Sequence, residues 1–128
     1  MKKVTGIGGI FFKCNDPNQM KDWYKEQLGL DTNEWGAMFQ SRDIDNANQV
    51  NHLQWSTFPN DSKYMEPSKA SFMINYRVAD LVGLEKELRA AGVTICDEIA
   101  EYEYGKFLHI LDPEGNKIEL WEPIDSGF

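Results

Sequence analysis

The chain has 128 residues, and its 13 Lys and Arg residues against 21 Asp and Glu residues give a formal net charge of −8. This length is typical of a single domain that buries roughly two-thirds of its unfolded surface without disulfides or a structural metal. The acidic balance disfavours nucleic acid and anionic membrane surfaces as partners, since both would repel most of the protein. No stretch approaches the about 18 apolar residues of a membrane-spanning helix, and the start lacks a secretion-signal pattern. We therefore expect a cytoplasmic protein in which Cys14 and Cys96 are buried free thiols.

The first half of the chain predicts a strand, a helix and three further strands. An apolar, β-rich run covers residues 4–14. Asp16 is a favourable N-cap, Pro17 suits the first helical turn, and Gly29 ends the apolar helical spacing. Three extended stretches follow, over 34–37, 38–42 and 49–58, and the polar segment 59–69 predicts a linker.

The second half repeats this order of elements. A strand over 70–78 precedes the N-cap Asp80 and a helical face that ends at Gly92. Asp16 and Asp80 lie 64 residues apart, which is half the chain length. The segment 112–116 contains Asp, Pro and Gly in an order that favours a tight turn between two strands. The three extended stretches of this half are 93–100, 105–111 and 117–122.

Two repeats of one helix and four strands indicate an α+β fold. We expect a single domain over residues 1–128, built of two βαβββ modules at about 4–58 and 70–123. Each sheet would pack one face against its helix. Paired modules would then form an open, cup-shaped sheet with the helices outside and a small-molecule site in the concave face.

Strand alternation predicts which side chains face the cup. On the last strand, Ile118 and Leu120 take the helix side. On strand 49–58 the parity stays open, because Trp55 suits either the core or the wall of a pocket, and a one-residue slip would exchange the two faces. The residues expected on the concave face include Gly9, Phe11, Lys13, His52, Gln54, Ser56, Met73, Asn75, Arg77, Lys117, Glu119 and Trp121.

The order of elements and three segments resemble the glyoxalase/bleomycin-resistance/extradiol-dioxygenase family, which is the vicinal oxygen chelate superfamily. The segments are DPNQMKDWYKEQLGL, INYRVADLVGLEKELRAAGV and YGKFLHILDPEGNKIELWEP, and the resemblance covers residues 4–123. It implies paired βαβββ modules, frequent dimerisation and, in many members, a divalent metal held by the first and last strands of each module. Other members of the family bind a ligand without metal.

The cofactor stays unknown from the sequence. The resemblance places ligand positions at Gly9, which has no side chain, and at Met73, whose thioether suits hard divalent metals poorly. Both residues disfavour a divalent metal. If one binds, the donors would be Glu119 and Gln54 with help from His52, which is a poor set for a closed site.

Glu119 has two interpretations. With Trp121 and Phe11 as an apolar wall, its pKa would rise toward neutrality and it would act as a catalytic acid or base. Alternatively it forms an ion pair with Arg77 or Lys13. These two cations would otherwise seat a carboxylate or phosphate. His109 is expected to be a satisfied or surface-facing strand residue rather than a ligand.

We therefore expect a glyoxalase-like protein that binds a small organic molecule and forms a homodimer. Two functions stay open: a lyase, isomerase or dioxygenase-type enzyme with Glu119 as its catalytic residue, and a metal-free, resistance-type protein that sequesters its ligand between aromatic walls. The expected ligand-binding residues are Phe11, Lys13, His52, Gln54, Met73, Asn75, Arg77, Tyr104 and Trp121.

Overall fold

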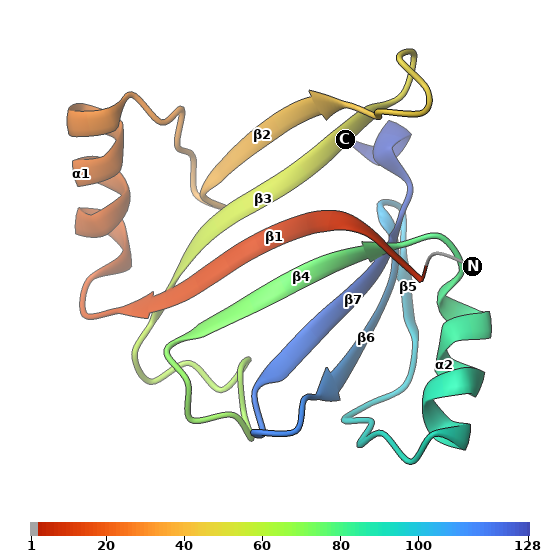
Figure 1. Cartoon of the computed structure of the whole chain (residues 1–128). Coiled ribbons are helices and arrows are strands. Elements are labelled where there is room, and N and C mark those ends of the chain that lie inside the picture. The colour runs from red at the N-terminus through yellow and green to blue at the C-terminus, as the bar shows by residue number, and fades with distance from the viewer. Residues whose placement is uncertain (1–2) are drawn as a thin grey trace.

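The computed structural model describes residues 3–128, which form one mixed seven-stranded sheet with two α-helices (Figure 1). The elements are β1 (Val4–Cys14), α1 (Pro17–Leu28), β2 (Ala37–Arg42), β3 (Val50–Pro59), β4 (Phe72–Val78), α2 (Leu81–Ala90), β5 (Ala100–Tyr102), β6 (Gly105–Leu111), β7 (Lys117–Pro123) and a 3-10 turn, η1 (Asp125–Gly127). The strand order is β2-β3-β1-β4-β7-β6-β5. At the centre β1 and β4 are antiparallel, and each has a parallel neighbour, β3 and β7 respectively. The predicted α+β class and open sheet are confirmed.

The predicted helix signals are confirmed. The Asp16 carboxylate accepts a hydrogen bond of 3.0 Å from the Gln19 N–H and caps α1. Asp80 caps α2 in the same way through the Gly83 N–H. These caps satisfy amide groups that the first helical turn leaves without a partner.

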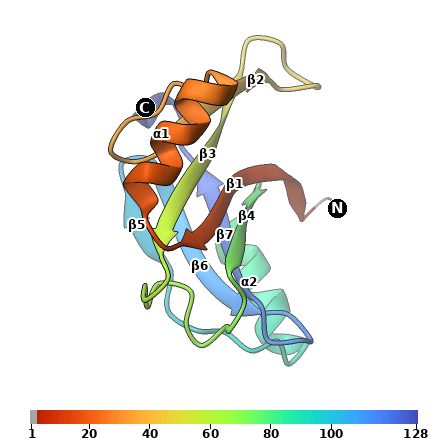
Figure 2. The ribbon, with the colours of Figure 1, turned by 90° about the vertical axis from the view of Figure 1, so that its left-hand side faces the viewer.

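The two helices lie at opposite ends of the sheet (Figures 1 and 2). They cover the same face, because Phe12 beneath α1 pairs with Phe72, which has the same parity on β4 as Tyr76 beneath α2. Beneath α1, the Trp55 ring lies 4.8 Å from the ring of Tyr24 and 5.5 Å from that of Phe12. Trp55 is therefore a core residue, and His52 and Gln54 lie on the opposite face, which resolves the parity that the sequence left open. We call that opposite, helix-free face the inner face.

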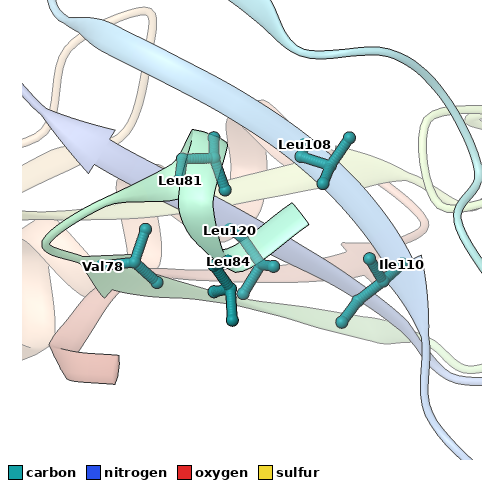
Figure 3. Close-up of a cluster of buried hydrophobic side chains, with 6 residues drawn as sticks. All are labelled: Val78, Leu81, Leu84, Leu108, Ile110 and Leu120. Atoms are coloured by element: carbon teal, nitrogen blue, oxygen red, sulfur yellow. The ribbon is translucent and has the colours of Figure 1, made fainter. Parts of the chain in front are cut away.

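The main apolar core lies beneath α2 (Figure 3). Leu81 and Leu84 of the helix pack on strands β4, β6 and β7, and Leu81 is fully buried. Such packing of an amphipathic helix on a sheet supplies most of the helix's stability. The cluster consists of Val78, Leu81, Leu84, Leu108, Ile110 and Leu120.

The eight strands expected from the sequence become seven. Residues 34–37 and 38–42 do not form two strands, since the extended chain begins only at Ala37. Residues 34 and 35 form a turn that a bridge between Asn33 and Gly36 closes. Gly36 has φ +120°, and a Cβ there would lie 1.9 Å from the Trp55 carbonyl oxygen, so this position requires glycine. Residues 93–100 are also not one strand: an isolated bridge joins Ile95 to Ile110, and β5 begins at Ala100.

Both cysteines are free thiols, as expected, but only Cys14 is buried. The expectation that Cys96 is also buried is wrong. Its backbone N–H donates to the His109 carbonyl of β6, and the residue itself is exposed. Within residues 3–128, no helix has both the length and the apolar character needed to cross a membrane.

Two segments of the chain cover parts of the inner face. From the predicted linker, the fully buried Met65 packs against Phe11 and Met73. After β7, the segment 124–128 places Phe128 against His52 and Trp121. The polar residues of the inner face therefore lie between two coverings that are not part of the sheet.

We predict that Leu81→Ala lowers the free energy of unfolding by about 2–5 kcal/mol, because it leaves a cavity in the core beneath α2. Leu28→Ala is the matched control, since the Leu28 side chain is 60% exposed at the end of α1. Its cost should stay within about 0.5 kcal/mol. Urea denaturation measures both, and equal losses would contradict the assigned core.

Candidate functional site

Five residues form one row across the inner face, each on a different strand. Gly9 of β1 pairs with Gln54 of β3 on one side and with Asn75 of β4 on the other. Asn75 pairs with Glu119 of β7, and Glu119 pairs with His109 of β6. Because directly paired residues point to the same face, this register brings the polar side chains together.

Glu119 is a buried carboxylate, 3% exposed, and it accepts hydrogen bonds from three side chains. The Asn75 amide donates to Oε1 at 2.7 Å. The His109 imidazole donates through Nε2 to Oε2 at 2.7 Å, and the Tyr64 hydroxyl donates to the same oxygen. Burial alone would raise the pKa of Glu119, but the hydrogen bonds from His109, Tyr64 and Asn75 outweigh it, so this pKa lies below its ordinary value. Glu119 is therefore ionised.

His109 lies between two carboxylates. Its Nδ1 is 2.5 Å from Asp97 Oδ2, and its backbone N–H donates to Asp97 Oδ1 at 2.8 Å. Burial would lower the pKa of His109, but Glu119 and Asp97 together raise it above its ordinary value. The Asp97 side chain is 42% exposed, so Glu119, His109 and Asp97 form a chain of proton-exchanging groups from the interior to solvent.

Tyr64 reaches the row from the linker rather than from the sheet. Its ring stacks on Phe58, meets His109 edge-on, and is covered by the Lys117 ammonium 5.4 Å from the ring centroid. Burial of the hydroxyl and the charge of Glu119 raise the pKa of Tyr64, so it stays a hydrogen-bond donor. The residue is nevertheless 43% exposed. It is thus a cover over Glu119 that faces solvent.

A second polar cluster lies next to the row, two residues further along β4. The Arg77 guanidinium donates to both carboxylate oxygens of Asp125, at 3.1 Å and 2.5 Å. His52 donates to Asp125 through its backbone N–H and through Nδ1. The guanidinium lies 5.2 Å from the Trp121 ring centroid. This cluster is a bidentate carboxylate-binding site, and the chain's own Asp125 occupies it.

The residues predicted to bind a ligand fall into distinct parts of the inner face. Asn75 meets Glu119 in the row, and Phe11 and Met73 are buried beneath Met65. Gln54 is in the row but donates to the Trp35 carbonyl at 2.9 Å. Five residues remain. Arg77, His52 and Trp121 lie in the second cluster, and the Tyr104 carbonyl accepts a hydrogen bond from Trp121 Nε1. Lys13 lies elsewhere, near the end of β1.

Two predictions about the charged residues are wrong. Arg77 and Lys13 do not seat one anion together, because Arg77 pairs with Gly6 near the start of β1 while Lys13 lies near its end. Glu119 does not pair with either cation, because Arg77 is bound by Asp125 and Lys13 lies near the end of β1. Its partner is His109, which points inward rather than to the surface.

The residues implied as metal donors do not fit a divalent ion. Gly9 has no donor atom, and a Cβ there would lie 2.6 Å from the Phe11 ring, so an aromatic ring fills that place. The donors proposed from the sequence are not brought together either: His52 is held by Asp125, and Gln54 by the Trp35 carbonyl. Within residues 3–128 there is no group of three His, Cys, Asp or Glu side chains arranged to hold a metal.

Sequence reasoning missed His109, Tyr64 and Asp97 as members of the site. A signal for His109 was present, since the turn at 112–116 pairs Leu111 with Lys117 and therefore His109 with Glu119. Tyr64 and Asp97 lie in irregular segments, where no alternation indicates which way a side chain points.

The side-chain oxygen of Asn75, Oδ1, is a buried hydrogen-bond acceptor without a partner among the described residues. The side chain is 2% exposed. A Cβ at position 8 would lie 2.4 Å from this oxygen, so Gly8 permits the close approach of strand and amide. A buried acceptor of this kind is satisfied by a donor from a bound molecule or water.

The comparisons with known proteins agree on the fold. The family model of the Glyoxalase/Bleomycin resistance protein/Dioxygenase superfamily matches residues 6–120. A search for curated relatives by sequence finds no significant match.

Solved structures with similar folds include methylmalonyl-CoA epimerase from Mycobacterium tuberculosis, with 22% identity over 96% of this chain and 91% of that one and a TM-score of 0.62. A variant of the Streptomyces coelicolor methylmalonyl-CoA epimerase in complex with 2-nitronate-propionyl-CoA has 20% identity, coverages of 94% and 99%, and a TM-score of 0.66. A superfamily member from Vibrio splendidus 12B01 has 13% identity, coverages of 91% and 97%, and a TM-score of 0.56. At these identities the likeness concerns the fold.

We predict that Glu119→Gln lowers the free energy of unfolding most strongly between pH about 4.5 and 6.5. The lowered pKa of Glu119 gives stability that is present above its ordinary value of 4.5 and is lost as the pH falls. The raised pKa of His109 gives stability that is present below its ordinary value of 6.5 and is lost as the pH rises through the raised one. Within this window both charges are present, and removing one should cost about 3 kcal/mol.

Urea denaturation at a series of pH values measures this profile, with Glu98→Gln as the control because Glu98 is exposed. The control should show no maximum. A cost for Glu119→Gln that does not change between pH 4 and 9 would contradict the ion pair.

Proposed function

This chain belongs to the glyoxalase/bleomycin resistance/dioxygenase superfamily, and from that premise we propose that it is a metal-independent proton-transfer enzyme of the isomerase or lyase type. The observation that carries the proposal is the ionised Glu119 carboxylate, buried on the inner face and connected through His109 to Asp97. The substrate would be a small organic molecule bound over this row.

Glu119 would act as the base. When a substrate takes the place of the Tyr64 ring, the lone pair of Oε2 that now accepts from Tyr64 becomes available to a C–H bond next to a carbonyl group. The proton passes to the carboxylate and the electron pair moves to the carbonyl oxygen. Returning the proton to another carbon completes an isomerisation, and expelling a leaving group completes an elimination.

The surrounding residues support this role without taking part in bond changes. The Asn75 amide orients the carboxylate by donating to Oε1. The Tyr64 phenol, which stays protonated because its pKa is raised, covers Oε2 until substrate takes its place. The His109 imidazolium keeps Glu119 ionised before substrate binds. Because Asp97 is partly exposed, the row can exchange its proton with solvent between turnovers.

The second candidate is ligand sequestration without catalysis, and the aromatic lining favours it. The Phe107 and Trp121 rings are stacked at 5.8 Å. The Phe58 ring is stacked at 5.6 Å on that of Tyr64, whose hydroxyl bonds Glu119. Such walls bind flat or apolar molecules. The two candidates differ in whether Glu119 is needed for function. A homodimer stays a prediction under both.

We predict that the protein accelerates exchange of C–H hydrogen for deuterium in a member of a panel of ketones and 2-oxo acids dissolved in D₂O. Glu119→Gln should reduce this rate by at least about 100-fold, which is typical for loss of a general base. Glu114→Gln, in the exposed turn between β6 and β7, is the matched control and should leave the rate unchanged. Proton NMR follows the exchange.

Equal exchange rates for the wild-type protein and Glu119→Gln would contradict the catalytic assignment. If no compound exchanges faster than in buffer and Glu119→Gln still binds an uncharged aromatic ligand, sequestration is the better account. Circular dichroism confirms that each variant is folded at the assay temperature.

A further inference from the structure

The second polar cluster defines the chemical class of the ligand. We propose that Arg77 and His52 bind the carboxylate of a small aromatic acid, and that Asp125 and Phe128 of the chain itself occupy this site until the acid displaces them. The proposal deepens the proposed function, and it rests on that function only for the claim that the bound acid then reacts at Glu119.

The cluster is built as a carboxylate site. The Asp125 carboxylate accepts four hydrogen bonds, two from the Arg77 guanidinium and two from the backbone N–H and Nδ1 of His52. The two parallel bonds from Arg77 match the planar geometry of a carboxylate. Any other carboxylate that reaches this position can make the same bonds.

The cationic half of the site does not depend on Asp125 for its position. Arg77 is 4% exposed on β4, and its guanidinium also donates to the His52 carbonyl and to Asn51 Oδ1, each at 3.0 Å. The Trp121 ring covers it. When Asp125 leaves, a buried cation stays in place without an anion, and that state is costly until another anion binds.

The anionic half lies on a segment that is not part of the sheet and is joined to it, among the described residues, by one backbone hydrogen bond, from the Ile124 N–H to the Tyr104 carbonyl. Asp125 belongs to the three-residue turn η1, beyond the end of β7 at Pro123. Its neighbours Ile124 and Phe128 are 47% and 55% exposed. The segment can therefore move away while β7 keeps its pairing. A surface cavity lined by Asn51, Arg77 and Asp125 opens beside the site and gives a route of entry.

The surroundings of Phe128 indicate which chemical group the ligand carries besides its carboxylate. Its ring lies 4.7 Å from that of His52, 5.8 Å from that of Trp121 and 6.0 Å from that of Tyr104. The space beside the carboxylate site thus already holds an aromatic ring between aromatic neighbours. A ligand that carries both groups, an aromatic carboxylic acid, would replace Asp125 and Phe128 together.

The position relative to Glu119 fits a substrate. Arg77 and Trp121 follow Asn75 and Glu119 by two residues on the same strands and point to the same face. Two residues along a strand span about 7 Å. The carboxylate site at Arg77 is therefore on the same face as Glu119 and about 7 Å from it along the strands, which is within the reach of a small acid.

Isothermal titration calorimetry with phenylacetate, and with phenylacetamide as its uncharged counterpart, tests the proposal. Asp125→Ala should bind phenylacetate at least about tenfold more tightly than the wild-type protein, because the competing carboxylate is gone. Asp61→Ala is the matched control, since it removes an exposed carboxylate outside the site. Its affinity should equal that of the wild type. Phenylacetamide should gain nothing from Asp125→Ala, and adding Arg77→Gln should abolish the gain for phenylacetate.

The proposal is overturned if Asp125→Ala gives no gain, or if the amide gains as much as the acid. Should Asp125→Ala fail to fold, Phe128→Ala and the wild-type protein replace it. Phe128→Ala should bind phenylacetate more tightly than the wild type, and saturating phenylacetate should shift the Phe128 ring signals of the wild type in NMR spectra. Unchanged affinity and unshifted signals would overturn it. Because the readout is binding, a protein that binds the acid but exchanges no deuterium would refute the proposed function alone.

Discussion

The inner face depends on one constraint, which is that the Glu119 carboxylate is buried among β-strands and must be compensated there. A charged group in such surroundings is stable only when it is paired and hydrogen-bonded. The sheet meets this requirement through its register, since Asn75 and His109 are the direct neighbours of Glu119 on the flanking strands. Tyr64 from the linker supplies the third donor, and Asp97 holds the far side of the imidazole. The polar chemistry of the face follows from this pairing.

The same principle explains the neighbouring cluster and the way the chain covers its own inner face. Arg77 is a second buried charge, and Asp125 from beyond the sheet compensates it. Between the polar groups, apolar contacts complete the surface, with Met65 over Phe11 and Met73. Both compensating segments, the linker and the stretch after β7, are irregular chain rather than strand. We propose that a ligand replaces these parts, because Glu119 and Arg77 are held in position by the strands themselves.

The sequence allowed the helices and most of the inner face to be predicted, because caps, glycines and strand alternation are local signals. Asp16 and Asp80 mark both helix starts, and alternation placed Asn75, Arg77, Glu119 and Trp121 on one face. The contact between His109 and Glu119 could also have been predicted, since the short turn between β6 and β7 determines which residues of the two strands pair. The roles of Tyr64 and Asp125 could not be predicted. Each forms a hydrogen bond with a residue more than 45 positions away, and each lies outside the strands, where the sequence has no periodicity. The predicted number of strands was wrong in two places. Before β2, the chain makes a turn that ends at Gly36. Before β5, the Asp97 side chain, and not a neighbouring backbone, accepts the hydrogen bond from the His109 N–H.

The central claim is that Glu119 and His109 are a charged pair at the centre of the inner face. A pH titration by NMR of protein labelled with ¹³C in Glu and ¹⁵N in His measures both groups in the same sample. The account predicts a Glu119 carboxyl carbon that titrates below pH 4.5 and a His109 ring that loses its proton above pH 6.5, so that carboxylate and imidazolium coexist between these values. A protonated Glu119 beside a neutral His109 ring in that range would contradict it.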